Sequence, residues 1–152
     1  MGVEEAEVER IRVLAWVYAA MFVSVVVVGY IPALNDEQGQ LLGLFSLQLH
    51  DDALHLGSAI WAAVAAWRSS TASRWYFRLF GPLYFLDGAL GLATGRGYLD
   101  AGIFLYGPAD LSWIVRIGAN TPHLLLGGGA VVIGYLLGDR GAPAPSSPAL
   151  AR

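Results

Sequence analysis

One stretch limits what this chain can fold into: residues 13–31 run for 19 positions without a charged side chain. A helix of this length is about 28 Å long, close to the thickness of the hydrocarbon core of a bilayer. A cleaved signal peptide typically begins with basic residues and ends at small ones. This stretch instead follows four glutamates and leads into Tyr30, Ile31 and Pro32. We therefore expect a retained helix that spans a membrane.

Three later stretches repeat this apolar character, at about residues 51–67, 75–94 and 122–137. The whole chain is 56% hydrophobic and only 14% charged, whereas soluble domains carry about 25% charged residues. The pattern predicts an all-α fold, a four-span transmembrane helix bundle built from two tandem helical hairpins. We expect a cytoplasmic N-terminal segment at 1–12, one membrane domain at 13–137 and a disordered cytoplasmic tail at 138–152.

The connections between these stretches differ in character. Residues 32–48 contain several turn formers, although 41–49 is apolar enough to lie at the membrane interface or to continue into the next helix. In the long segment 95–116, Tyr98, Tyr106 and Trp113 are spaced like interfacial anchors. Pro122 suits the first turn of the fourth helix, where its missing N–H costs nothing. Gly81 and Pro82 predict a kink inside the third helix.

Arginine positions predict the orientation, because basic residues concentrate on the cytoplasmic side of membrane proteins. With four spans, most arginines fall on the side of the two termini, and most aspartates fall on the other side. Both termini are therefore expected in the cytoplasm. The arginines on that side are Arg10, Arg12, Arg68, Arg74, Arg78, Arg140 and Arg152.

Several functional classes are excluded or disfavoured by composition. The chain has no cysteine, so it offers neither a disulfide framework nor a thiolate metal site. A net charge of −3 without a basic stripe argues against nucleic-acid binding. The sequence contains no phosphate loop, metalloprotease helix or serine with a neighbouring base. We therefore expect a protein that is not an enzyme.

Polar residues at the start of the second and fourth predicted helices form a repeated pattern. Residues 50–57 read His-Asp-Asp-Ala-Leu-His-Leu-Gly, and residues 120–127 read Asn-Thr-Pro-His-Leu-Leu-Leu-Gly. The orientation places His55 and His123 at similar depth. Asp87 joins them, because it lies 13 residues from Arg74 just as His55 lies 13 residues from Arg68. Ionisable groups inside a membrane usually face the bundle interior and contact one another, so we predict one polar layer.

The four spans and this repeated pattern resemble an uncharacterised bacterial family of small four-helix membrane proteins, a domain of unknown function with a His-Leu-x-x-Gly-like motif. The second copy matches at Asn120, His123, Leu124 and Gly127. The first copy matches at Asp52, His55 and Leu56 and has Ala59 in place of the glycine. The resemblance covers about residues 13–137 and implies a multi-pass protein of the bacterial inner membrane. It implies no catalytic activity.

Two interpretations of the polar layer stay open. His55 and His123 could bind haem b through their imidazoles, or, with Asp87, a divalent metal ion with an open coordination position. Alternatively, these residues hydrogen-bond to each other and join the helices. A second cluster, His50, Asp51 and Asp52, could collect a cation weakly at the outer surface or cap the second helix, and Asn120 belongs to the same polar set.

These alternatives give two functional hypotheses. The leading one is a non-catalytic scaffold or accessory subunit, and the other is a haem- or metal-binding redox subunit. The expected partners are the lipid bilayer and either further copies of the chain or a larger membrane complex, with no nucleic acid.

Overall fold

The computed structural model describes residues 3–37, 40–41 and 49–137, and this part of the chain is all-helical, as predicted. Its long helices are α1 (Val3–Gly29), α2 (Leu49–Arg68), α3 (Ser70–Thr94) and α5 (Trp113–Val131). The shorter elements are a 3₁₀ turn at Pro32–Leu34, the five-residue helix α4 (Gly102–Tyr106) and a π-helical end at Val132–Leu137. The predicted tail and most of the segment 41–49 lie outside the described residues.

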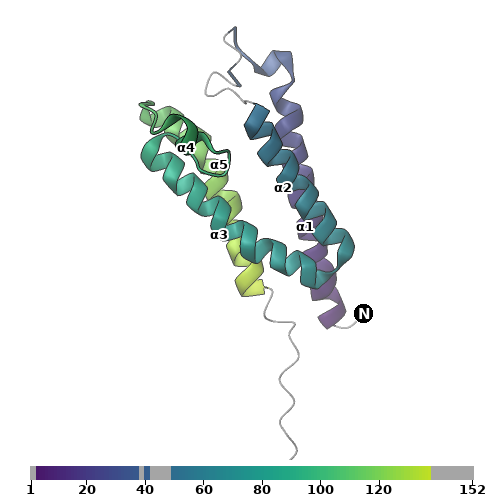
Figure 1. Cartoon of the computed structure of the whole chain (residues 1–152). Helices are drawn as coiled ribbons and strands as arrows, with labels where there is room; N and C mark the ends of the chain where they lie inside the picture. The colour runs from purple at the N-terminus through teal and green to yellow at the C-terminus, as the bar shows by residue number, and fades with distance from the viewer. Residues whose placement is uncertain (1–2, 38–39, 42–48, 138–152) are drawn as a thin grey trace, which may run out of the picture.

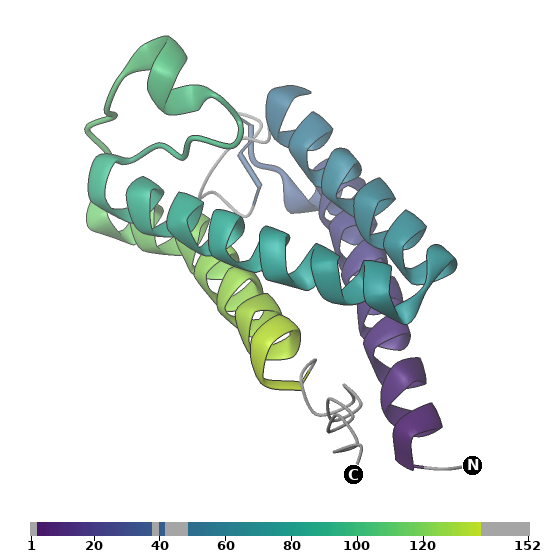
Figure 2. The same cartoon turned by 60° about the horizontal axis from the view of Figure 1, so that its bottom comes forward.

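The long helices form two antiparallel hairpins, α1 with α2 and α3 with α5 (Figure 1). Contacts within each hairpin are more extensive than contacts between them. The hairpins meet where α3 begins, directly after α2, and they diverge toward the end that carries α4. Figure 2 shows that α1 begins and the π-helical end finishes at the opposite end from α4.

Two of the helices are long and apolar enough to cross a membrane, Glu9–Gly29 in α1 and Trp113–Leu137 in α5 with its π-helical end. Helices α2 and α3, which cover the other two predicted spans, do not meet the same measure of length and composition. Both carry charged residues along their length: Asp51, Asp52 and Arg68 in α2, and Arg74, Arg78 and Asp87 in α3.

The predicted start of the fourth helix at Pro122 is wrong, because α5 begins at Trp113 and Pro122 lies inside it. The polar residues before Pro122 suggested a loop, but the structure accommodates them within the helix. Arg116 donates hydrogen bonds to the carbonyls of Leu111, Ala93 and Ala109, which satisfy its guanidinium. The segment 95–116 is accordingly shorter as a connection than predicted and contains α4.

The core lies where the hairpins meet and consists mostly of aromatic residues and alanines. The α3 rings stack on one another, with centroids 5.1 Å apart for Tyr76 and Phe80 and 4.7 Å apart for Phe80 and Tyr84. Phe22 of α1 packs edge-on against Phe80 and Tyr84. The Tyr18 hydroxyl donates a hydrogen bond to the Leu126 carbonyl of α5, so the first hairpin is also bonded to the last helix.

Candidate ligand-binding cavity

A cavity of about 940 Å³ opens between the hairpins at the end where they diverge. Its walls come from α1, α2, α3, the connection that contains α4, and α5. Phe22, Leu54 and Leu126 contribute apolar surface to its walls, whereas imidazoles, carboxylates and Arg96 supply polar groups. The three ionisable residues predicted to share a layer, His55, Asp87 and His123, all line this cavity.

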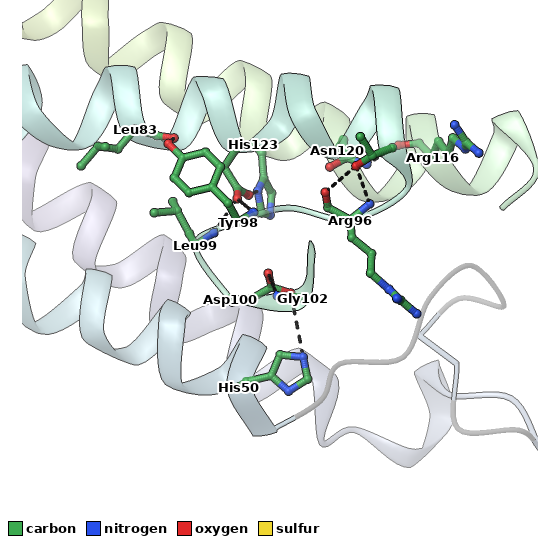
Figure 3. Close-up of polar contacts among 12 residues, drawn as sticks. His50, Leu83, Arg96, Tyr98, Leu99, Asp100, Gly102, Arg116, Asn120 and His123 are labelled. Carbon is green, nitrogen blue, oxygen red and sulfur yellow. Dashed lines mark hydrogen bonds and ion pairs between the residues drawn. The ribbon is translucent and has the colours of Figure 1, made fainter. Parts of the chain in front are cut away.

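Asp87 is the most completely bonded of these residues. It is 2% exposed, and its Oδ2 lies 2.8 Å from Nδ1 of His123. Its Oδ1 accepts hydrogen bonds from the backbone N–H groups of Tyr98 (2.6 Å) and Leu99 (2.8 Å). Figure 3 shows these three partners, Tyr98, Leu99 and His123, close together. Three donors on one buried carboxylate stabilise its charged form.

Gly97 makes this arrangement possible. A Cβ atom at position 97 would lie only 2.5 Å from Oδ1 of Asp87, so a side chain there would displace either the carboxylate or the loop. A pair of glycines at 95 and 97 is a pattern typical of a tight loop. Gly95 adopts a left-handed conformation with φ of 82° and ends α3.

His123 is held on two sides. Its Nδ1 faces Asp87, and Tyr84 stacks on its ring with centroids 4.3 Å apart and planes 17° apart. A neutral imidazole beside a carboxylate carries its proton on the nitrogen that faces the carboxylate. Nε2 then keeps its lone pair, and no described residue hydrogen-bonds to it.

His55 approaches from the other hairpin. It is 7% exposed, packs against Phe22, and has its ring centroid 6.3 Å from that of His123. Its Nδ1 is buried without a well-aligned hydrogen bond among the described residues, although the backbone of Asp51 lies beside it. His55 therefore shares the predicted layer with Asp87 and His123 but is not hydrogen-bonded to either of them.

The residues three positions before each histidine are also buried. Asp52 is 6% exposed and Asn120 is 7% exposed. The Tyr30 hydroxyl donates to Oδ2 of Asp52 over 2.7 Å, while the Asn120 amide donates to the Arg116 carbonyl over 2.8 Å. Asp52 is thus directed toward the end of α1, and Asn120 contacts α3 at Gly91.

The cluster at the mouth of the cavity differs from the predicted one. His50 and Asp51 are joined by Asp100 of the connection between α3 and α5, and Asp52 is bonded to Tyr30 instead. Ligand atoms of the three mouth residues lie within 4.8 Å of one another. Nε2 of His50 is 3.9 Å from Oδ2 of Asp100 (Figure 3). Asp51 and Asp52 lie in the first turn of α2, not at its cap.

The connection contributes residues that sequence reasoning did not assign to the site. Tyr98 was predicted as an interfacial anchor, but its backbone binds Asp87 and its hydroxyl donates to the Leu83 carbonyl over 2.7 Å. Burial and the charge of Asp87 raise the pKa of Tyr98. Arg96 lines the cavity and packs over the ring of Tyr106, with its guanidinium carbon 5.1 Å from the ring centroid.

Comparison with known proteins gives one match. The family model described as a domain of unknown function, DUF4383, matches residues 12–136. Comparisons with curated proteins and with solved structures found no match. The matched segment contains all four long helices in whole or in large part, together with the cavity. The chain therefore belongs to the DUF4383 family.

Proposed function

We propose that the protein crosses the membrane four times and binds a ligand, without catalysis, in the cavity between its hairpins. It would act as a scaffold or accessory subunit. The observation that carries this proposal is the distribution of apolar surface. In the most apolar part of the Glu9–Gly29 segment only 33% is buried within the protein, and in that of Trp113–Leu137 only 22% is buried. The core helix of a soluble protein is instead mostly buried.

Helices α2 and α3 support the same interpretation despite their charges. Their ionisable groups near the cavity are turned inward, since Asp52, His55 and Asp87 are all buried. Their outward positions are large and apolar, which suits contact with lipid. These exposed positions are Leu56, Ile60, Trp61, Val64 and Trp67 on α2, and Trp75, Leu79, Leu83, Phe85 and Leu86 on α3.

The cavity would open on the non-cytoplasmic side. Arginines gather at the end opposite α4, where α1 begins and α2 gives way to α3. The positive-inside rule places that end in the cytoplasm. The mouth of the cavity, with His50 and Asp100, would then face outward, and a ligand would enter from outside the cell.

A binding role fits the bonding of the polar residues better than acid–base catalysis does. Both oxygens of Asp87 accept hydrogen bonds, so this carboxylate orients its neighbours and has little capacity left to move a substrate proton. The second candidate function, a haem- or metal-binding subunit, is favoured by the two neighbouring imidazoles, whose ring centroids are 6.3 Å apart.

Single cysteines test the proposed topology and cavity, because the chain has no cysteine of its own. A membrane-impermeant maleimide applied to cells whose outer face is accessible should label Asp110→Cys in the outer connection and Ala119→Cys in the cavity wall. Thr71→Cys, in the first turn of α3, should stay unlabelled until the membrane is permeabilised. Ile117→Cys, which is two residues from Ala119 and exposed toward the lipid, is the matched control and should label poorly.

Two outcomes would contradict the proposal. Labelling of Thr71→Cys from outside would reverse the orientation or remove a crossing. Equal, poor labelling of Ala119→Cys and Ile117→Cys would mean that the cavity is not open to water.

A further inference from the structure

We propose that the ligand in this cavity is a transition-metal centre bound by Nε2 of His123 and by a ring nitrogen of His55. This inference rests on the proposed function only in requiring an accessible cavity. It assigns Asp87 the role of orienting His123 rather than of binding the metal.

The Asp87–His123 pair has the arrangement of a metal-binding histidine and its supporting carboxylate. Histidines that bind metals almost always donate their other ring N–H to a carboxylate, a backbone carbonyl or water, which fixes the tautomer and raises the basicity of the ligand. Here the 2.8 Å contact fixes Nδ1 of His123 as the donor. Its Nε2 lone pair remains for a ligand in the cavity.

The support behind His123 is itself held in place. Asp87 receives two backbone N–H groups from the loop after α3, and Gly97 lets that loop approach closely. Tyr84 stacks on the imidazole and limits its rotation. A histidine side chain held by such a buried, ordered support loses little conformational freedom when it binds a metal.

His55 supplies the second nitrogen at a suitable distance. Metal–imidazole bonds are about 2.0–2.1 Å long, so the ring centroids of two imidazoles on one metal lie roughly 4.5 Å apart at a right angle and roughly 6.5 Å apart on opposite sides of the metal. The observed separation between His55 and His123 is 6.3 Å, which fits imidazoles on opposite sides of a metal. His55 is more than nine-tenths buried, lines the same cavity and makes no well-aligned hydrogen bond through Nδ1, although the Asp51 backbone lies beside it.

Packing alone does not account for this pair. A buried polar group without a good hydrogen bond costs free energy, and an apolar side chain in the place of His55 would avoid that cost. A metal that joins the two rings would also link the hairpins where they diverge. The remaining coordination positions would face the cavity.

Two sources could supply such a metal centre, a free divalent ion and the iron of haem b. Both use the same imidazole nitrogens. The volume of about 940 Å³ and the apolar walls can accommodate a porphyrin, with Arg96 available for its acidic groups. A free ion would occupy a small part of that space and leave room for a further ligand.

The test uses the full-length protein purified in detergent and stripped of metal with a chelator. One sample is titrated with Co²⁺, whose visible absorption reports its ligands, and another with haemin followed by reduction. We expect saturable binding of one equivalent of one probe. His55→Ala and His123→Ala should each weaken this binding at least tenfold, and Asp87→Asn should weaken it about 10- to 100-fold.

His50→Ala is the matched control, since it removes the third histidine of the chain at the cavity mouth and should leave binding unchanged. Circular dichroism and gel filtration establish that each variant is folded. His55→Gln and His123→Gln replace any alanine variant that is not, because glutamine retains volume and polarity.

The proposal is overturned if folded wild-type protein binds neither probe, or if binding persists in both histidine variants. Loss of binding in His50→Ala alone would also overturn it and would place the metal at the mouth. If neither probe binds but the maleimide still labels Ala119→Cys from outside, the metal-binding inference is wrong and the proposed cavity stands. Loss of that labelling would overturn the proposed function instead.

Discussion

The two hairpins carry the same short motif in different surroundings. In the first hairpin, His55 packs against Phe22 of α1 and has no carboxylate hydrogen-bonded to it among the described residues. In the second, His123 is bonded to Asp87 of α3, which is bonded in turn to the following loop. The motif brings a histidine to a given depth in both hairpins. The neighbouring helix decides whether that histidine is hydrogen-bonded.

The hairpins also differ in how closely their helices approach. A Cβ atom at Gly127 of α5 would overlap the backbone of Phe85 in α3, and one at Gly91 would overlap the Asn120 side chain. The corresponding position in α2 is Ala59, which is buried with its methyl group in place. Backbones in the second hairpin therefore meet where glycine leaves room, while those of the first are separated by alanine side chains.

The largest effect is expected from removing the carboxylate that is present only in the second hairpin. Asp87→Leu leaves two backbone N–H groups and His123 without an acceptor, and it should lower the free energy of unfolding by about 3–5 kcal/mol. Asp87→Asn keeps an acceptor and the shape, so it should cost about 1 kcal/mol. Unfolding by SDS titration, followed by circular dichroism, measures both. Equal stabilities for the two variants would show that Asp87 does not join α3, the loop and α5.

Exchanging the motif's small residue between the hairpins should give two smaller losses of stability that differ in size. Gly127→Ala places a methyl group against the Phe85 backbone and should destabilise the protein by about 2–3 kcal/mol. Ala59→Gly removes a methyl group and loosens a helix, at a cost of about 1 kcal/mol. The same titration distinguishes them. A larger loss for Ala59→Gly would reverse our account of how the two hairpins pack.

Gly97→Ala tests the loop that supports only His123. The added methyl group would crowd Oδ1 of Asp87 and should destabilise the protein by about 1–2 kcal/mol. It should also weaken metal-probe binding, because His123 would lose its fixed partner. If the double variant Gly97→Ala with Asp87→Asn is destabilised by the full sum of the single effects, the loop and the carboxylate act independently.

The smallest effect is expected in the first hairpin at Gly57, whose added Cβ atom would meet nothing within 4 Å. Gly57→Ala should stabilise α2 by about 0.5–1 kcal/mol, because alanine favours the helix over glycine. Thermal unfolding in detergent measures this gain. A loss of stability would mean that a ligand, lipid or partner packs against this exposed glycine.

The helical fold was largely predictable, and the errors have clear physical causes. Long uncharged runs predict helices in an apolar environment because such helices satisfy their own backbone hydrogen bonds. The start of α5 was misplaced because Pro122 suits the first turn of a helix, where its missing N–H costs nothing. In the folded chain, Arg116 binds carbonyls of the connection and of α3, and Asn120 is buried against Gly91.

The candidate site was predictable in its residue types but not in its bonds. Counting along the predicted helices brought His55, Asp87 and His123 to one depth, and the cavity contains all three. Counting does not specify the rotation of each helix about its axis. It therefore could not distinguish His123 from His55 as the partner of Asp87.

The sequence by itself determined that the chain is helical, that four apolar stretches alternate in direction and that polar residues recur at matching positions. These properties depend on local composition and on the helical repeat. Only the tertiary structure decided that the loop after α3 folds back to donate two N–H groups to Asp87, and that Asp100 joins His50 at the cavity mouth. Such contacts depend on the packing of glycine against backbone and on the path of a connection, which no single segment specifies.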